Sequence, residues 1–556
     1  MVRATFSGFN TALSALQANQ KRLDITGQNL SNMNTAGYTR QQLEASSLNY
    51  TNPVSHYSNG NETAVGFGVS MDRVSQIRDP YLDIQYRSQS ADCSYTNRLQ
   101  TALNSLSKVL DETTISGIRQ AFDDVQSTLT SMQDPAKVSD PIYESELRTK
   151  MQSVCNLFNQ ASRQITQAEQ NEFQRLTGEG SSEQGDVQKI NDILRQIGDL
   201  NVQIKRNQVA GHPSLELQDE RNLLLDELSG YIPVETRYYK DDAHSGNNAY
   251  DYDANGAVIG KKDWPDDLEV SMNYIDAQGK SQKLILVNGS DLGADGLTKN
   301  YGQLSMLKGD HQTAASVSDP ANISIKFEKA PSYQGNGQAA ADVYAELKGI
   351  HFEGGSLQAS LDMLQKTGTG TVINGSTAVD DVRGYQYYSG KLDQLASTFA
   401  KSMNDINNGK KQDQNLLSNS TDDSTTGITA GNIGISKGWT SGTIHISTDG
   451  TNRTDTILDM IAAMKDTKKL NGKTFADYMN NLSTQLASDS SSNQTALKTG
   501  TTVLNSIQDS RDSLSGVSLD EEATNMMTYV SAYNAASRLM TALDEVLNTL
   551  ISNTGA

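Results

Sequence analysis

The stretch that decides the fold is FSGFNTALSALQANQKRLDITGQNL, residues 6–30, together with LDEEATNMMTYVSAYNAASRLMTALDEVLNTLI, residues 519–551. In both, apolar residues recur at alternating steps of three and four, which places them along one face of an α-helix. The first stripe consists of Phe6, Phe9, Leu13, Leu16, Leu23 and Leu30. The second consists of Met526, Tyr529, Tyr533, Ala536, Met540, Leu543, Leu547 and Leu550. The sequence therefore predicts an amphipathic helix near each end.

These two helices carry almost no charge. Residues 4–20 contain no charged side chain, and Arg538 is the only one between Glu522 and Asp544. The second stripe is also widened by Val530, Leu539, Val546 and Ile551, so its face is too broad for a single partner helix. Two interpretations follow: ordinary core helices of one domain, or helices buried between subunits of an assembly. If the helices are buried between subunits, we expect both ends to lack order in the isolated chain.

Composition narrows the class of protein. The 556 residues include 46 Lys and Arg against 66 Asp and Glu, a net charge of -20, which opposes nonspecific binding to nucleic acid or anionic membrane. Cys93 and Cys155 both fall in helix-like sequence and predict no disulfide framework. Residues 1–30 hold no continuous apolar run, so they predict neither a Sec-type signal nor a membrane span.

Between the two ends, apolar residues at helical spacing predict several long helices. The predicted ranges are roughly 79–110, 115–132, 141–177, 186–209, 214–229, 356–365, 384–407 and 455–510. Asn29, Asn32, Asn34 and Gly37 are expected to end the first helix and to lead into an extended segment, because Asn and Gly tolerate left-handed backbone. Helices of these lengths favour a rod-like bundle.

The character of the sequence changes after Gly230. Residues 231–350 hold alternating strand-like pieces separated by Gly and Asn turns, and residues 409–450 return to loop and strand. The fold class predicted is therefore a multidomain α+β protein with a terminal helical coiled-coil domain, a long-helix bundle and an inserted β-rich outer domain. The predicted domains are 1–55 with 511–556, 56–235 with 384–510, and 236–383, to which 409–450 adds unless it forms a small β region of its own.

Catalytic and metal motifs find little support. The six histidines are scattered without His-Glu-x-x-His spacing, and no Gly-x-Ser-x-Gly elbow is present. Asp251, Asp253, Asn255 and Gly256 match the first half of a calcium loop, but Lys262 stands where a bidentate Glu belongs, so a hairpin turn is the simpler interpretation. We expect no enzyme activity, no cofactor and no metal.

Several segments carry a family resemblance. Residues 6–16, FSGFNTALSAL, and 29–40, NLSNMNTAGYTR, resemble the N-terminal signature of bacterial flagellar axial proteins. Further segments narrow the resemblance to the hook-associated protein 1 family of the hook–filament junction. They are residues 66–69, 77–82, 211–228 and 516–522, with Tyr529, Ala532 and Tyr533. Residues 216–221 are more charged than the usual leucine-rich form of that segment.

The resemblance implies a structural protein that joins hook to filament as a ring of about eleven subunits with heterologous contacts. It implies an extracellular place in the flagellum, export without a cleaved signal through the flagellar type III apparatus, and an export chaperone on the C-terminal helix. The implied partners are copies of itself, the hook protein and the next junction protein. Alternatives are a hook or distal-rod protein, or a surface adhesin carried on an axial scaffold.

The candidate site is an assembly interface rather than a catalytic centre. We expect it to consist of the apolar stripes of the two terminal helices and of the turn that follows the first. Its predicted residues are Phe6, Phe9, Leu13, Leu16, Leu23, Leu30, Asn34, Gly37, Tyr38, Met526, Val530, Tyr533, Met540, Leu543, Leu547 and Leu550.

Overall fold

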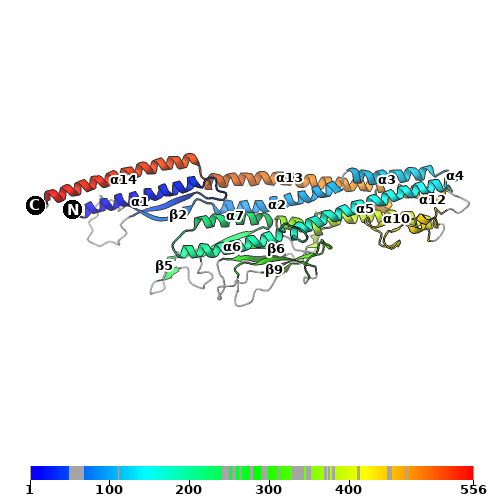
Figure 1. Cartoon of the computed structure of the whole chain (residues 1–556), viewed down its shortest axis with the longest axis horizontal. Helices are drawn as coiled ribbons and strands as arrows, with labels where there is room; N and C mark the ends of the chain where they lie inside the picture. Colours follow the sequence, from blue (N-terminus) through cyan, green and yellow to red (C-terminus); the bar gives the residue numbers. More distant parts are fainter. Residues whose placement is uncertain are drawn as a thin grey trace.

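The structure is a computed structural model of the whole chain. It describes residues 2–48, 68–109, 112–138, 140–240, 250–252, 258–261, 266–275, 280–289, 299–309, 313–328, 343–345, 352–368, 372–373, 376–377, 382–409, 413–447, 454–470 and 472–554. The molecule is a long rod with both chain termini at one end (Figure 1).

The terminal segments form that end of the rod. Helix α1 (Val2–Ser31) and helix α14 (Leu519–Thr554) lie side by side and run in opposite directions, as Figure 1 shows. A two-stranded antiparallel hairpin, β1 (Gln41–Ser47) and β2 (Val69–Gln76), packs on α1. The helices predicted at the two ends are therefore confirmed. The expectation that both ends lack order in a single chain is wrong for this structure, because each helix covers part of the other.

The middle and far end of the rod are a helical bundle. The bundle consists of α2 (Pro80–Val109), α3 (Glu112–Ser131), α4 (Pro135–Val138), α5 (Pro141–Thr177), α10 (Tyr385–Asn408), α12 (Asp455–Met464) and α13 (Phe475–Ser515). Its core contains an aromatic cluster in which the Phe122 ring lies 5.2–5.9 Å from the rings of Phe158, Phe399 and Phe475. Edge-to-face and stacked rings at this spacing add to the area they bury.

Three further helices carry the inserted β region along one side of the bundle. They are α6 (Asp186–Val209), α7 (Leu215–Tyr231) and α9 (Ser356–Gln365). One sheet has the strand order β3 (Glu235–Lys240), β6 (Asp266–Ile275), β7 (Ser281–Asn288), and another β10 (Val343–Ala345), β9 (Ile323–Glu328), β8 (Gln303–Lys308). The buried Asn201 of α6 donates from Nδ2 to the carbonyls of Leu268 (3.1 Å) and Gly289 (3.0 Å), which fixes the first sheet to the helix.

Smaller pairs complete the fold. They are β4 (Tyr250–Tyr252) with β5 (Val258–Lys261), β11 (Val372–Ile373) with β12 (Ser376–Thr377), and β13 (Leu417–Asn419) with β14 (Ile433–Ile435). Short helices α11 (Lys437–Ser441) and η2 (Lys468–Leu470) lie near the far end. The antiparallel pairing of β4 with β5 supports the hairpin interpretation of 251–258, whose turn lies outside the described residues.

The predicted fold class is confirmed, and most predicted helices begin and end close to their observed bounds. The helical prediction for 455–510 is confirmed, with one break inside the range: α12 ends at Met464 and α13 begins at Phe475, with Thr474 as its N-cap. Strand β2 differs from the sequence expectation: residues 66–69 read as a short strand-like piece, whereas the observed strand extends from Val69 to Gln76, where it pairs with β1.

Candidate assembly interface

Small residues bring α1 and α14 close together. Ala12 and Ala18 of α1 and Ala536 of α14 are buried. A Cβ placed on Gly8 would lie 3.4 Å from Cδ1 of Leu543, an ordinary contact distance. Arg22 of α1 lies over the Tyr529 ring of α14, with 5.6 Å from the guanidinium carbon to the ring centroid. One face of each helix is thus occupied within a single chain.

The apolar flanks of α14 are left uncovered by the same chain. The residues on these flanks, with their exposed fractions, are Met527 65%, Val530 43%, Leu539 49%, Val546 55% and Ile551 61%. Aliphatic side chains exposed in this density on one helix are typical of a surface that binds another molecule. The broad, uncharged stripe noted in the sequence therefore divides into a part that packs on α1 and a part that faces outward.

The predicted interface residues fall into three groups. Half-buried residues are Phe9, Leu16, Leu23, Leu30, Tyr38, Met526, Met540, Leu543 and Leu547. Exposed residues are Leu13, Asn34, Gly37, Val530, Tyr533 and Leu550. Phe6 lies in α1, and its side chain is outside the described set. Their role in assembly stays a prediction.

A polar joint ties the terminal helices to the bundle. Asn29, buried near the end of α1, donates from Nδ2 to the carbonyl of Gln41 (3.0 Å) and accepts at Oδ1 from the Gln41 amide (3.0 Å) and the Tyr38 hydroxyl (2.9 Å). Arg40 pairs through Nε with the buried Glu522 (2.8 Å), and its amide donates to the Ser515 carbonyl (2.9 Å). Gly37, at φ 78°, supplies the left-handed turn between these contacts. The link between α13 and α14 is therefore held by the segment after α1.

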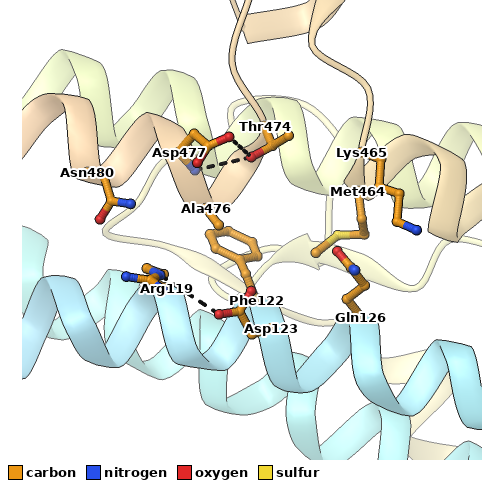
Figure 2. Close-up of a pocket in the computed structure, with 10 residues that line it drawn as sticks. All are labelled: Arg119, Phe122, Asp123, Gln126, Met464, Lys465, Thr474, Ala476, Asp477 and Asn480. Atoms are coloured by element: carbon orange, nitrogen blue, oxygen red, sulfur yellow. Dashed lines mark hydrogen bonds and ion pairs between the residues drawn. The ribbon is translucent and has the colours of Figure 1, made fainter.

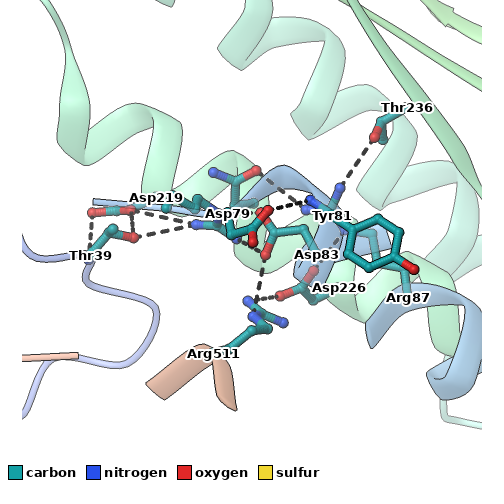
Figure 3. Close-up of polar contacts among 11 residues, drawn as sticks. Thr39, Asp79, Tyr81, Asp83, Arg87, Asp219, Asp226, Thr236 and Arg511 are labelled. Atoms are coloured by element: carbon teal, nitrogen blue, oxygen red, sulfur yellow. Dashed lines mark hydrogen bonds and ion pairs between the residues drawn. The ribbon is translucent and has the colours of Figure 1, made fainter. Parts of the chain in front are cut away.

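The same segment reaches the bundle through Thr39. Its amide and hydroxyl both donate to Asp219 of α7, at 3.1 and 2.6 Å (Figure 3). Arg78 donates to the Thr39 hydroxyl (3.3 Å) and pairs with Asp83 through Nη2 (3.1 Å). Buried charges of this kind are tolerated because each is paired and hydrogen-bonded.

Arg511, near the end of α13, closes the network. Its guanidinium contacts Asp83 (3.3 Å) and Asp226 (2.8 Å) and lies 4.3 Å from the centre of the Tyr86 ring. Asp226 is shared with Arg87 of α2, whose Nε lies 2.8 Å away (Figure 3). Segments 29–40, 77–82 and 211–228, noted in the sequence for their resemblance, thus meet at one place. Arg511 was missed, because nothing local in the sequence distinguishes it from a surface charge.

The buried Asp219 makes the joint sensitive to pH. Burial raises the pKa of its carboxyl from 3.8 to about 6, although the hydrogen bonds from Thr39 act in the opposite direction. Between pH 3.8 and about pH 6, Asp219 holds a proton in the folded chain but has released it in the unfolded chain. The stability from this group is therefore complete below pH 3.8 and is lost as pH rises through 6.

We expect Asp219→Asn to remove this dependence. Relative to the variant, the wild-type chain should lose up to about 3 kcal/mol of unfolding free energy between pH 4 and pH 7. Denaturant unfolding at several pH values measures the difference. Asp199→Asn, at an exposed position of α6, is the control. A wild-type-to-variant difference that stays constant over this range would contradict the assignment.

A pocket lies at the far end of the bundle, between α3 and the start of α13 (Figure 2). Its volume is about 290 Å³, and its floor includes Phe122 and Met464. The Thr474 hydroxyl donates to Asp477 (2.8 Å) and accepts from the Asp477 amide (3.2 Å), the reciprocal bonds of a helix N-cap. None of its lining residues is a histidine or cysteine.

Among the described residues, no cluster of His, Cys, Asp and Glu side chains is placed to hold a metal ion. Within the same part of the chain, no helix is long and apolar enough to cross a membrane.

Comparison with known families matches three parts of the chain. Residues 103–416 match the flagellar hook-associated protein FlgK helical domain. Residues 9–39 match the flagella basal body rod protein family, and residues 510–553 match the C-terminal family of the flagellar basal body rod FlgEFG proteins. The second match covers most of α1 and the turn after it, and the third covers the end of α13 and nearly all of α14.

The chain is similar to individual flagellar proteins over different shares of its length. Flagellar hook-associated protein 1 of Bacillus subtilis is 28% identical over 566 residues, covering 99% of this chain and 99% of the relative. The protein of the same name from Salmonella typhimurium is 29% identical over 230 residues, which cover 41% of this chain and 38% of the relative. A solved flagellar hook junction protein FlgK from Burkholderia pseudomallei aligns over 60% of this chain and 46% of its own, with 18% identity and a TM-score of 0.39.

The three family matches show that the chain is a component of the bacterial flagellum and that it comes from a group of structural proteins rather than enzymes. The match to the helical domain then specifies the member. The chain belongs to the flagellar hook-associated protein FlgK family, and it is a structural protein of the hook–filament junction.

Proposed function

We propose that α1 and α14 form the contact between neighbouring subunits at the junction. The observation that supports this most is that both flanks of α14 are left uncovered in a single chain: Leu539 and Val546 on one side and Val530 on the other are about half exposed. Because each of the three is already about half buried, covering the rest of it contributes about half of the roughly 1.5–3 kcal/mol that full burial gives. Repeated around a closed assembly, that term is large enough to hold subunits together without any covalent link.

The assembly we infer is a ring of about eleven subunits with heterologous contacts. In it, α1 and α14 make an inner helical tube, the bundle surrounds the tube, and the β region faces outward. The proposed domains are 1–55 with 511–556, 56–235 with 384–510, and 236–383. The break between α13 and α14 at 516–518 supports a division near residue 511.

The proposed partners are the hook protein on one side of the ring and the next hook-associated protein on the other. We place the assembled protein outside the cell and propose export without a cleaved signal peptide. The outward flank of α14 is available before assembly, so an export chaperone that covers an amphipathic helix would bind there. We propose no catalytic activity and no cofactor.

Two deletions test this proposal in cells that lack the native gene. Loss of residues 519–556 removes α14 and should abolish filament attachment and motility. Loss of residues 236–345 removes strands β3 to β10 and keeps α9, which packs on α2, α5 and α10. We expect filaments to remain, since those strands lie away from α1 and α14 (Figure 1). Filament counts by electron microscopy and swimming in soft agar measure both. Filaments on cells carrying the first deletion would overturn the assembly role of α14.

A further inference from the structure

The end of the rod that holds both termini is a packing unit of its own. Helices α1 and α14 and strands β1 and β2, which we call the terminal unit, pack mainly on one another (Figure 1). Among the described residues, none of these four elements packs along a helix outside the unit. The bundle has its own aromatic core around Phe122. Each part is therefore stabilised from within, and little apolar packing connects the two.

Three short segments carry the chain across the joint between these parts. They are residues 32–40, 77–79 and 516–518, and none of them belongs to a helix or a strand. Gly516 follows α13 in extended backbone (φ −73°, ψ 156°), so α13 does not continue into α14. Hinges in proteins are a few loop residues that absorb a change in φ and ψ. All three crossings meet that condition.

The hydrogen bonds that cross the joint converge on Thr39. Its amide and hydroxyl both donate to Asp219, and its hydroxyl accepts from Arg78. From β2, Gln76 Nε2 donates to the carbonyl of Leu215 at the start of α7 (2.9 Å). Water can replace each of these partners when the two parts separate, so each bond contributes only modestly to the closed arrangement.

Apolar contact across the joint is slight. A Cβ placed on Gly37 would lie 3.5 Å from Cβ of Leu223 in α7, yet Leu223 stays 47% exposed. The Arg40 amide donates to the Ser515 carbonyl beside the break between α13 and α14, where a rotation moves atoms least. Small polar interfaces between domains permit relative motion, whereas large apolar ones prevent it.

We propose that the joint is a hinge, on which the terminal unit swings as one body against the bundle. Thr39, held by Asp219 and Arg78, is the catch that favours the closed arrangement.

The buried ion pairs near the joint do not oppose this motion. Arg511 pairs with Asp83 and Asp226 within the bundle, and Arg40 pairs with Glu522 within the terminal unit. Swinging therefore leaves each buried charge with its partner. The hinge lets the bundle tilt while the surfaces of α1 and α14 keep their contacts. Because the motion lies within one chain, it is independent of whether α14 joins subunits.

Double electron–electron resonance on the monomeric full-length chain tests the hinge. One pair of spin labels spans the joint, on Thr502→Cys of α13 and Ser537→Cys of α14, both exposed positions. The matched control pair, on Thr502→Cys and Gln120→Cys of α3, lies within the bundle. Both native cysteines are buried and so escape labelling. We expect a wider distance distribution across the joint than within the bundle. Equal widths would overturn the hinge.

The catch is tested by Thr39→Val, which keeps the shape of the side chain and removes its hydroxyl. We expect the distribution across the joint to widen further, while the pair within the bundle is unchanged. Thr35→Val is the matched control, because the Thr35 hydroxyl is exposed and bonds to Asn32 in its own segment. A Thr39→Val distribution equal to that of the wild type would overturn the role of Thr39.

A disulfide across the joint should stop the motion. The Cβ separation of Gly37→Cys and Leu223→Cys, 3.5 Å on the observed backbone, falls in the range of disulfides. Left-handed backbone at residue 37 makes this substitution mildly unfavourable, so thermal unfolding should confirm the fold. With the disulfide formed before labelling, the distribution across the joint should narrow to that of the bundle pair. A distribution that stays wide would place the bending elsewhere and overturn the hinge.

Discussion

Replacing Leu539 and Val546 with glutamate is expected to abolish filament attachment while leaving the isolated chain folded. Both side chains lie on the same outward flank of α14 and are about half exposed in a single chain. A carboxylate there keeps its water in the monomer and costs little. Between subunits it would be buried without a partner, at a cost of several kcal/mol for each charge. Affinity for the neighbouring subunit should therefore fall by more than about a thousandfold.

The matched control is Ser531→Glu with Thr549→Glu, which adds the same charge to exposed polar positions of the same helix. Thermal unfolding by circular dichroism should show similar melting for the two double variants. Filament counts should separate them, with filaments lost only for Leu539→Glu/Val546→Glu. Normal filaments on cells carrying that variant would mean that this flank stays in water after assembly.

Arg511→Ala is expected to lower the free energy of unfolding by about 3–5 kcal/mol, the usual loss when one partner of a buried ion pair is removed. The Arg511 side chain is only 15% exposed and contacts both Asp83 and Asp226. Without it, the two carboxylates keep Arg78 and Arg87 but lose the cation between them. The Tyr86 ring also loses its cation–π contact.

Denaturant unfolding of the purified chain measures this effect. Arg511→Lys keeps the charge but not the planar fork, so we expect an intermediate loss. Arg538→Ala, at an exposed position of α14, should change stability by less than about 0.5 kcal/mol. A loss below about 1 kcal/mol for Arg511→Ala would show that water or another side chain replaces the arginine.

The sequence predicts the helices well because each long helix carries its own apolar period. Helix α5 illustrates this, since its observed bounds, Pro141–Thr177, are those of the predicted range. Strand β2 was only partly predicted, because VSMDRVSQ has no clear apolar alternation and is held by its pairing with β1. The break between α12 and α13 lies in residues 465–474, KDTKKLNGKT, where Leu470 is the only apolar residue, and the apolar pattern resumes only at Phe475.

The joint is harder to predict, since its contacts join distant parts of the chain. Arg40 and Glu522 are 482 positions apart, and Thr39 and Asp219 are 180 apart. Nothing in one sequence says which buried charge pairs with which. The stripe of α14 is the opposite case: its width and lack of charge indicate more than one neighbour, and the structure shows which side α1 covers. The expected disorder of both ends failed because this pairing and the joint hold them within one chain.

We expect the flank of α14 that carries Leu539 and Val546 to be exposed before assembly and buried afterwards. The most direct measurement is maleimide labelling of Val546→Cys in the soluble chain and in isolated flagella. Both native cysteines, Cys93 and Cys155, are buried, and Ser318→Cys on the β region serves as the exposed control. We expect rapid labelling of Val546→Cys in the soluble chain and protection in flagella, while Ser318→Cys reacts in both. Equal labelling of Val546→Cys in the two states would contradict it.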